Sequence, residues 1–175
     1  KVSFRNRYGI MLAADLYMPR NVNEKLPAIA VSGPFGAVKE QSAGLYAQTM
    51  AERGFLTIAF DPSYTGESGG FPRYVASPDI NTEDFCAAVD YLSTRDDVDS
   101  ERIGIIGICG WGGMAVNAAA IDTRIKATVT STMYDMSRVN ANGYFDAMDA
   151  DARYELRKQL NAQRTADAKR SEERR

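Results

Sequence analysis

The sequence predicts an α/β protein in which a mostly parallel sheet lies between helices. Three observations support this fold class: predicted strands and helices alternate along the chain, most predicted strands are continuous apolar runs, and clusters of glycine and proline separate the elements. Continuous apolar runs are typical of strands that helices cover on both faces. The 175 residues, 45% of them hydrophobic, are enough to bury one core of this kind.

The first elements are predicted to be a hairpin, a buried strand and a helix. Residues 2–5 and 11–18 alternate apolar and polar residues on either side of RNRYG, which is typical of two antiparallel strands. The run LPAIAVSG, residues 26–33, then predicts a strand covered on both faces. Residues 40–54 predict an amphipathic helix that ends at Gly54, because glycine commonly closes a helix.

The next elements repeat this order of strand and helix. FLTIAF, residues 55–60, predicts a second covered strand, and the loop DPSYTGESGGFPR after it is dense in turn-forming residues. Residues 77–95 predict a helix with Thr82 as its N-cap, because acidic residues then follow in the first turn. The later predicted elements are a strand at 102–108, a helix at 112–121 and a strand at 125–132.

The chain is expected to divide into a core, residues 1–139, and a charged C-terminal extension, residues 140–175. From about Asp146 the composition changes, since no strand pattern remains and apolar residues form only a thin stripe. This composition predicts a charged helix, which either extends the core or begins a lid.

The composition also limits which partners and which cellular location are expected. A net charge of -2 gives no field that would gather nucleic acid or anionic lipid, so neither is expected as a partner. No window approaches the roughly 18 apolar residues that span a membrane. The two cysteines lie in a predicted helix and at a predicted strand end, which is no disulfide framework. We therefore expect a cytoplasmic protein that acts on a small molecule, although the first residue, Lys1, leaves a removed leader open.

The chain contains no histidine. Most sites that pair a nucleophile with a base near neutral pH use imidazole as the proton carrier, because its pKa is about 6.5. The chain itself therefore supplies no base of this kind, whatever its nucleophile.

The stretch GICGWGG, residues 107–113, places a cysteine between a predicted strand and a predicted helix. A nucleophile above a parallel sheet needs a very tight turn at this point, and small neighbours let the backbone pass close by. Four glycines around Cys109 supply this room, and the N-terminus of the following helix favours a thiolate. Cys109 is therefore a candidate nucleophile; a packing role is the alternative, because free cysteine is often buried.

GICGWGG after a strand, preceded by SGPFGAVKEQ and FDPSYTGESGG, resembles the alpha/beta-hydrolase superfamily, most closely a dienelactone-hydrolase-like branch whose nucleophile can be cysteine. The resemblance covers residues 2–134 and keeps the three motifs in consistent order. It implies a three-layer alpha/beta-hydrolase fold with an antiparallel N-terminal hairpin. It also implies hydrolysis of ester, lactone or thioester bonds without a metal or an organic cofactor.

The resemblance implies roles for single residues as well. Cys109 becomes the nucleophile, and the backbone N–H of Gly110 becomes one donor of the oxyanion hole. The second donor comes from the turn after the third strand, where Phe35 is expected because the proline before it has no N–H. Trp111 and Tyr134, near strand ends, are expected to wall an apolar acyl pocket.

Two departures from the family pattern bear on activity. Trp111 stands where the motif usually has a glycine. In the family the acid and the histidine come from later strands and loops, but no strand is predicted after residues 125–132. The chain therefore resembles the N-terminal part of such a hydrolase, truncated on its C-terminal side, and we expect it to be weak or inactive alone. An open sheet edge is then expected to pair with a missing C-terminal segment or to form a homo-oligomer.

Two other interpretations of the function stay open at this point. The chain can be a non-catalytic hydrolase-like scaffold or binding module. GWGGMA also fits the dinucleotide fingerprint G-x-G-x-x-A through Gly110, Gly112 and Ala115, although several strands precede it. Lys39 and Glu40 are expected to be solvated charges at the start of a helix.

Overall fold

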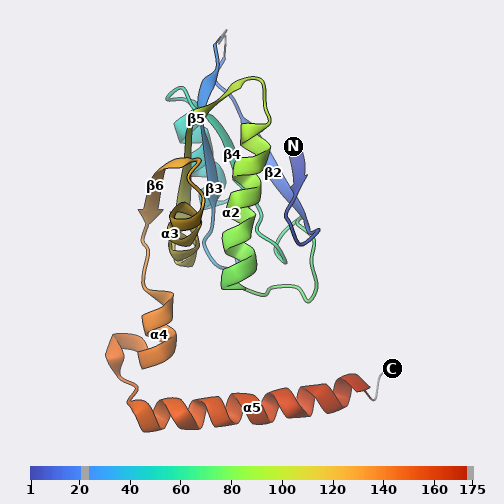
Figure 1. The fold of residues 1–175 in the computed structure, drawn as a ribbon, viewed down its shortest axis with the longest axis vertical. Helices are drawn as coiled ribbons and strands as arrows, with labels where there is room; N and C mark the ends of the chain where they lie inside the picture. Colours follow the sequence, from blue (N-terminus) through green and yellow to red (C-terminus); the bar gives the residue numbers. More distant parts are fainter. Residues whose placement is uncertain (21–23, 173–175) are drawn as a thin grey trace. The chain divides into compact units, whose positions relative to one another are not determined.

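The computed structural model describes residues 1–20 and 24–172 and contains a six-stranded sheet flanked by helices (Figure 1). The strands are β1 (Val2–Arg5), β2 (Met11–Tyr17), β3 (Leu26–Ser32), β4 (Leu56–Phe60), β5 (Val98–Ile108) and β6 (Ile125–Ser131). The helices among them are α1 (Ser42–Ala51), α2 (Pro78–Ser93) and α3 (Gly110–Ile121). The elements follow one another in the predicted order.

The strand order in the sheet is β1-β2-β4-β3-β5-β6. β1 and β2 form the predicted antiparallel hairpin, and β2 also pairs antiparallel with β4. β4, β3, β5 and β6 run parallel to one another, with Ala30 of β3 level with Ile58 of β4 and Ile105 of β5. The prediction of a mostly parallel sheet with an antiparallel hairpin at one edge is confirmed.

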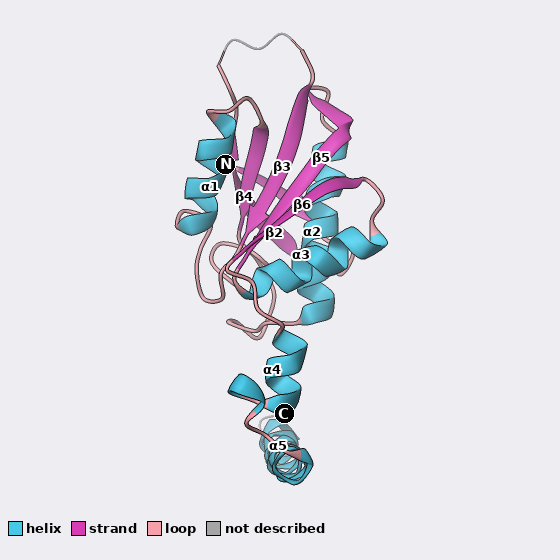
Figure 2. Cartoon of the chain, turned by 90° about the vertical axis from the view of Figure 1, so that its left-hand side faces the viewer, coloured by secondary structure: helices cyan, strands magenta, loops and turns pink. Residues whose placement is uncertain are grey.

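Helices cover both faces of the sheet, which gives three layers (Figure 2). α1 lies on one face against β3 and β4, and α2 and α3 lie together on the other face. The side chains of β3 alternate accordingly, because successive residues of a strand point to opposite faces. Ala28 and Ala30 belong to the core under α2 and α3, whereas Ile29 and Val31 belong to the core under α1.

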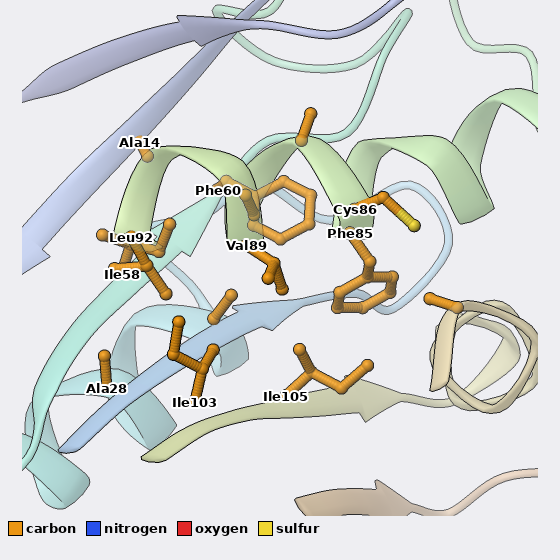
Figure 3. Close-up of a cluster of buried hydrophobic side chains, with 14 of the residues drawn as sticks. Ala14, Ala28, Ile58, Phe60, Phe85, Cys86, Val89, Leu92, Ile103 and Ile105 are labelled. Atoms are coloured by element: carbon orange, nitrogen blue, oxygen red, sulfur yellow. The ribbon is translucent and has the colours of Figure 1, made fainter. Parts of the chain in front are cut away.

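The core under α2 combines aromatic and branched side chains of the helix and the sheet (Figure 3). Phe85 of α2 packs edge-on against Phe60 of β4, with ring centroids 5.3 Å apart and planes at 86°. Leu92 of α2 and Ile105 of β5 are buried in the same core. Each such side chain stabilises the fold by roughly 1.5–3 kcal/mol on leaving water, so this face fixes α2 and the strands firmly.

The structure corrects the start of α2. The sequence predicts Thr82 as the N-cap, but the helix begins at Pro78 with Ser77 as its N-cap. Proline suits the first position of a helix because it needs no N–H partner there and its φ is preset. The side chain of Asn81 accepts the Ser77 N–H at 2.8 Å. Thr82 therefore lies inside the helix, where it is buried.

The residues from Asp135 onward form a second compact unit, and the first unit ends at Tyr134. The second unit contains α4 (Met136–Asn142), the 3-10 helix η1 (Tyr144–Asp146) and the long helix α5 (Ala150–Glu172). The Asp135 side chain caps α4 by accepting the Arg138 N–H at 2.9 Å. The sequence predicts the charged helix α5 but not α4, and the division expected between residues 139 and 140 falls within α4.

Charged residues occur along the whole of α5. Two ion pairs join residues three apart on its surface, Glu155 with Lys158 and Asp167 with Arg170. Within residues 1–20 and 24–172, no helix has both the length and the apolar composition needed to cross a membrane.

Candidate active site

Cys109 occupies a strained turn between β5 and α3. Its φ and ψ are 58° and -128°, a backbone conformation that residues with a side chain rarely adopt. Such a conformation costs on the order of 1–3 kcal/mol and persists only where the surrounding structure enforces it. Strained backbone of this kind is concentrated at functional sites. GICGWGG therefore forms a sharp strand-to-helix turn with the cysteine at its tip.

Backbone hydrogen bonds hold this turn on both sides. The Cys109 N–H donates to the Ser131 carbonyl at the end of β6 at 2.8 Å, and the Cys109 carbonyl accepts the Gly112 N–H at 2.9 Å. The Ser131 hydroxyl in turn lies 2.8 Å from the hydroxyl of Tyr46 on α1. The turn is thus tied to β6 and, through Ser131, to the helix on one face of the sheet.

Two glycines let backbone segments approach the turn closely. A Cβ at Gly107 would lie 2.3 Å from the Trp111 carbonyl oxygen, so α3 starts directly beside β5 only because residue 107 is glycine. A Cβ at Gly33, whose φ is 103°, would lie 2.4 Å from the Ile108 carbonyl oxygen. The turn after β3 therefore rests against the turn after β5, which is the juxtaposition that an oxyanion hole requires.

Phe35 and Gly110 are in direct contact. A Cβ added to Gly110 would lie 1.9 Å from Cε2 of Phe35, so the phenyl ring fills the place where a side chain would stand. Gly110 is the first residue of α3, and the first N–H groups of a helix have no partner within the helix. Cys109 itself is partly exposed. Cys109, Gly110 and Phe35 thus come together at a helix N-terminus, which stabilises negative charge.

The two predicted pocket residues have different surroundings. Trp111 is 2% exposed and belongs to the core under α2 and α3, where its ring meets the Phe35 ring edge-on with centroids 4.7 Å apart. Its Nε1 has no hydrogen-bond partner among the described residues. Trp111 therefore packs against Phe35 inside the core, and its role in a pocket stays a prediction. Tyr134 is 40% exposed, and its role in a pocket stays a prediction.

The second cysteine lies in a different environment. Cys86 is on α2, in the core, and is 6% exposed. Burial, together with the negative charges of Asp122 and Glu83, raises the pKa of its thiol to about 11. Cys86 is therefore protonated near neutral pH, and it offers an internal reference for the reactivity of Cys109.

A buried ion cluster that the sequence did not predict lies at the end of the turn that carries Phe35. Lys39 is expected to be solvated, but its side chain is 1% exposed, whereas Glu40 is half-exposed as expected. The Lys39 Nζ pairs with three carboxylates, those of Glu40 at 2.8 Å, Asp61 at 3.1 Å and Glu67 at 2.6 Å. The signal for this cluster was a lysine shortly after one apolar strand and an aspartate directly after the next.

The ion pairs change the charge states of the cluster. Burial alone acts to lower the pKa of Lys39, but hydrogen bonds to the three carboxylates outweigh it and raise the pKa above its usual value. Hydrogen bonds from Lys1 and Lys39 lower the pKa of Glu67 to about 2. Lys39 and Glu67 are therefore both charged at neutral pH.

The dinucleotide fingerprint finds no support in this geometry. That motif needs its glycines so that a pyrophosphate can approach the backbone. Here the Phe35 ring occupies the space beside Gly110, and a Cβ at Gly112 would lie 2.8 Å from Cβ of Met133. The glycines of GWGGMA thus make room for side chains of the protein itself.

A three-layer α/β fold with a strained cysteine turn at the carboxyl end of a parallel strand defines this protein as an alpha/beta hydrolase by fold. Within that class, the chain belongs to the family described as X-Pro dipeptidyl-peptidase (S15 family), which matches residues 8–175. The alpha/beta-hydrolase resemblance seen in the three sequence motifs is confirmed.

Several relatives are similar to this chain. It is 68% identical to the protein PA2218 of Pseudomonas aeruginosa over 169 residues, which make up 96% of this chain and 46% of that protein. The crystal structure of PA2218 matches with a TM-score of 0.93 and 67% identity, over 97% of this chain and 53% of that one. Thiohydrolase aneE of Aspergillus aculeatus is 32% identical over 130 residues, 74% of this chain and 40% of that protein.

A more distant structure is that of Est1E from Butyrivibrio proteoclasticus with ferulic acid bound. It is 27% identical with a TM-score of 0.65, and the match covers 73% of this chain and 51% of that one. This chain therefore spans about half the length of the curated relatives that it matches.

Proposed function

We propose that this chain carries the acyl-transfer machinery of a hydrolase of esters, lactones or thioesters, with Cys109 as its nucleophile. The observation that carries the proposal is the backbone of Cys109, a residue with a side chain and a φ of 58° between β5 and α3. Such a turn presents the side chain above the sheet, beside the first N–H groups of the helix. The name of thiohydrolase aneE supports thioesters as a substrate class, and the ferulic acid bound to Est1E is a carboxylic acid, the kind of product that ester hydrolysis releases.

In the proposed reaction, the Cys109 sulfur forms a bond to the acyl carbonyl carbon, and the thiol proton passes to solvent. The carbonyl oxygen becomes negative and accepts hydrogen bonds from the N–H groups of Gly110 and Phe35, which stabilise it. The bond from the carbonyl carbon to the alkoxide or thiolate leaving group then breaks. The acyl group remains on Cys109 as a thioester.

Release of the acyl group needs a general base that activates water. Imidazole usually supplies it, and loss of the proton carrier slows the step by about 10²- to 10⁴-fold. The sequence contains no histidine. We therefore expect acylated Cys109 to accumulate in this chain, which makes the chain a weak hydrolase by itself.

We further propose that a segment covering the open side of the sheet supplies the base. Among the described strands, the edge strand β6 pairs with β5 alone. An apolar groove of about 510 Å³ lies beside it, lined by Met50, Phe55 and residues of β3, β5 and β6. The chain spans about half the length of its relatives, so the occupant that we propose is a segment equivalent to the other half of PA2218.

Mass spectrometry of the intact chain tests the acyl-transfer proposal. After incubation with p-nitrophenyl butyrate, we expect one butyryl group per chain and a burst of one equivalent of p-nitrophenolate, followed by little turnover. Cys109→Ala should abolish both the adduct and the burst. The matched variant Cys86→Ala should keep them, because that thiol is buried and protonated. An adduct that persists in Cys109→Ala contradicts the proposal.

A further inference from the structure

The ion cluster at the end of the turn after β3 is built from four residues. We define the Lys39 cluster as Lys39, Glu40, Asp61 and Glu67. The Lys39 side chain is 1% exposed, and its ammonium group pairs with all three carboxylates at 2.6–3.1 Å. A buried ammonium is strongly unfavourable without such partners. The place of residue 39 in the fold therefore depends on these pairs.

The Lys39 cluster fixes backbone as well as side chains. Asp61 lies directly after β4 and is fully buried. One oxygen of its carboxylate accepts the Lys39 N–H at 2.7 Å, and the other accepts the Glu67 N–H at 2.9 Å. Lys39 is thus attached to the end of β4 twice, through its backbone N–H and through its side-chain ammonium group.

The turn that carries Phe35 is fixed at both ends. At its start, Gly33 rests against the Ile108 carbonyl, directly beside the Cys109 turn. At its other end, Lys39 is attached to Asp61. Phe35 lies between these two anchors, with its ring against Gly110. A shift of either anchor moves the Phe35 N–H relative to the sulfur.

We propose that Lys39 is a positioning residue for acyl transfer, because it holds the turn that presents the Phe35 N–H to the oxygen of an acyl group on Cys109. Lys39 acts through the backbone of this turn. The proposal rests on the proposed function, since a positioned oxyanion donor matters only where Cys109 accepts acyl groups.

Two reactions of the Cys109 sulfur distinguish a positioning role of Lys39 in acyl transfer from a role in stability alone. Acylation by p-nitrophenyl butyrate forms an S–C bond, expels p-nitrophenolate and passes through a negative carbonyl oxygen that the turn stabilises. Alkylation by iodoacetamide forms an S–C bond and expels iodide with no such oxygen. The ratio of the two rate constants at Cys109 therefore reports on the oxyanion donors and not on exposure of the thiol.

The variant Lys39→Met removes the ammonium and keeps the length of the side chain. Loss of one oxyanion donor costs about 10²- to 10³-fold in other enzymes, so we expect displacement of the turn to lower the acylation-to-alkylation ratio about tenfold or more. Lys39→Arg keeps the charge and should restore part of the ratio. Lys1→Met is the matched control, because it removes a second ion-pair partner of Glu67 without touching the turn, and its ratio should stay within about twofold.

Each outcome decides the proposal. A wild-type ratio in a folded Lys39→Met variant overturns it. Where Lys39→Met shows no cooperative unfolding, Glu67→Gln weakens the same cluster while leaving Asp61 and Glu40 as partners; a lowered ratio there supports the proposal, and an unchanged ratio overturns it. If wild-type Cys109 has the same ratio as free N-acetylcysteine, the proposed function fails and this inference falls with it.

Discussion

Gly110 and Gly113 are close neighbours in the first turns of α3, but their surroundings differ. The place of a side chain at Gly110 is taken by the Phe35 ring, whereas nothing lies within 4 Å of a Cβ built on Gly113. Packing therefore requires glycine at position 110. At position 113 glycine only weakens the helix, by roughly 0.5–1 kcal/mol relative to alanine.

The two glycines predict opposite effects of the same substitution. Gly110→Ala forces the Phe35 ring to move, and we expect it to lower the free energy of unfolding by about 1–3 kcal/mol and to slow acylation of Cys109. Gly113→Ala should raise the free energy of unfolding by about 0.5–1 kcal/mol and leave acylation unchanged. Urea unfolding curves measure both changes. Equal stability of the two variants would contradict the contact between Phe35 and Gly110.

Two buried carboxylates organise the loop between β4 and α2, one directly after β4 and the other on α2. Asp61 receives the Glu67 N–H, and Asp84 of α2 receives the Ser63 N–H at 2.8 Å and the Asn6 side chain at 2.9 Å. Burial raises the pKa of Asp84, against the effect of these hydrogen bonds. The loop is thus an ordered element whose stability depends on charged acceptors.

Glu67 makes this loop sensitive to acid. Its pKa falls from the ordinary 4.5 to about 2 in the folded chain. A lowered folded pKa means that the unfolded chain binds the proton more strongly, so the stability due to Glu67 is present above pH 4.5 and is lost as the pH falls to about 2. We expect the Tm of Glu67→Gln to be lower than that of the wild type at pH 7, and to fall less steeply below pH 5.

Circular dichroism melts across this pH range measure the effect. Glu155→Gln is the matched control, because Glu155 pairs only with the exposed Lys158 of α5 among its described ion pairs, and its profile should follow the wild type. A Glu67→Gln profile parallel to the wild type would show that this carboxylate does not contribute to acid sensitivity.

The elements that the sequence predicts correctly are those whose cause is local. β3 and β4 are apolar runs and β6 is rich in β-branched residues, and the predicted ends of all three agree with the structure to within one residue. The predicted N-cap of α2, Thr82, lies several residues after the true one. Thr82 and Pro78 both follow accepted rules for helix starts, and packing decides which of them begins the helix. Burial of Lys39 depends on Asp61 and Glu67, which are distant in sequence, so local pattern could not show it. At the site, the motif predicts the turn at Cys109, but it does not predict the Lys39 cluster at the end of the neighbouring turn after β3.

In the first unit, the centre of the sheet is buried, whereas the edge strand β6 is partly exposed. Every residue of β4 is buried, whereas no residue of β6 is fully buried. Val129 of β6 is 52% exposed and lines the apolar groove beside Met50 and Phe55. Exposed edge strands readily pair with another chain. This side of the sheet is where we propose that a further segment binds.

The half of PA2218 outside the matched region should bind this chain when added as a separate polypeptide. We expect the two to elute together in size-exclusion chromatography, and turnover of p-nitrophenyl butyrate to rise by about 10²-fold or more if the added half brings a general base. The same mixture with Cys109→Ala should bind but remain inactive. Separate elution of the two polypeptides would count against the proposed covering segment.

A cysteine at a strained turn in a chain without imidazole has one practical consequence. If acyl groups transfer to Cys109 but leave slowly, the acyl group of the donor that reacted first remains bound to the sulfur. A pool of competing donors with different acyl masses could then be ranked in one spectrum, so that the preference of the site is observed without an assay for any single substrate.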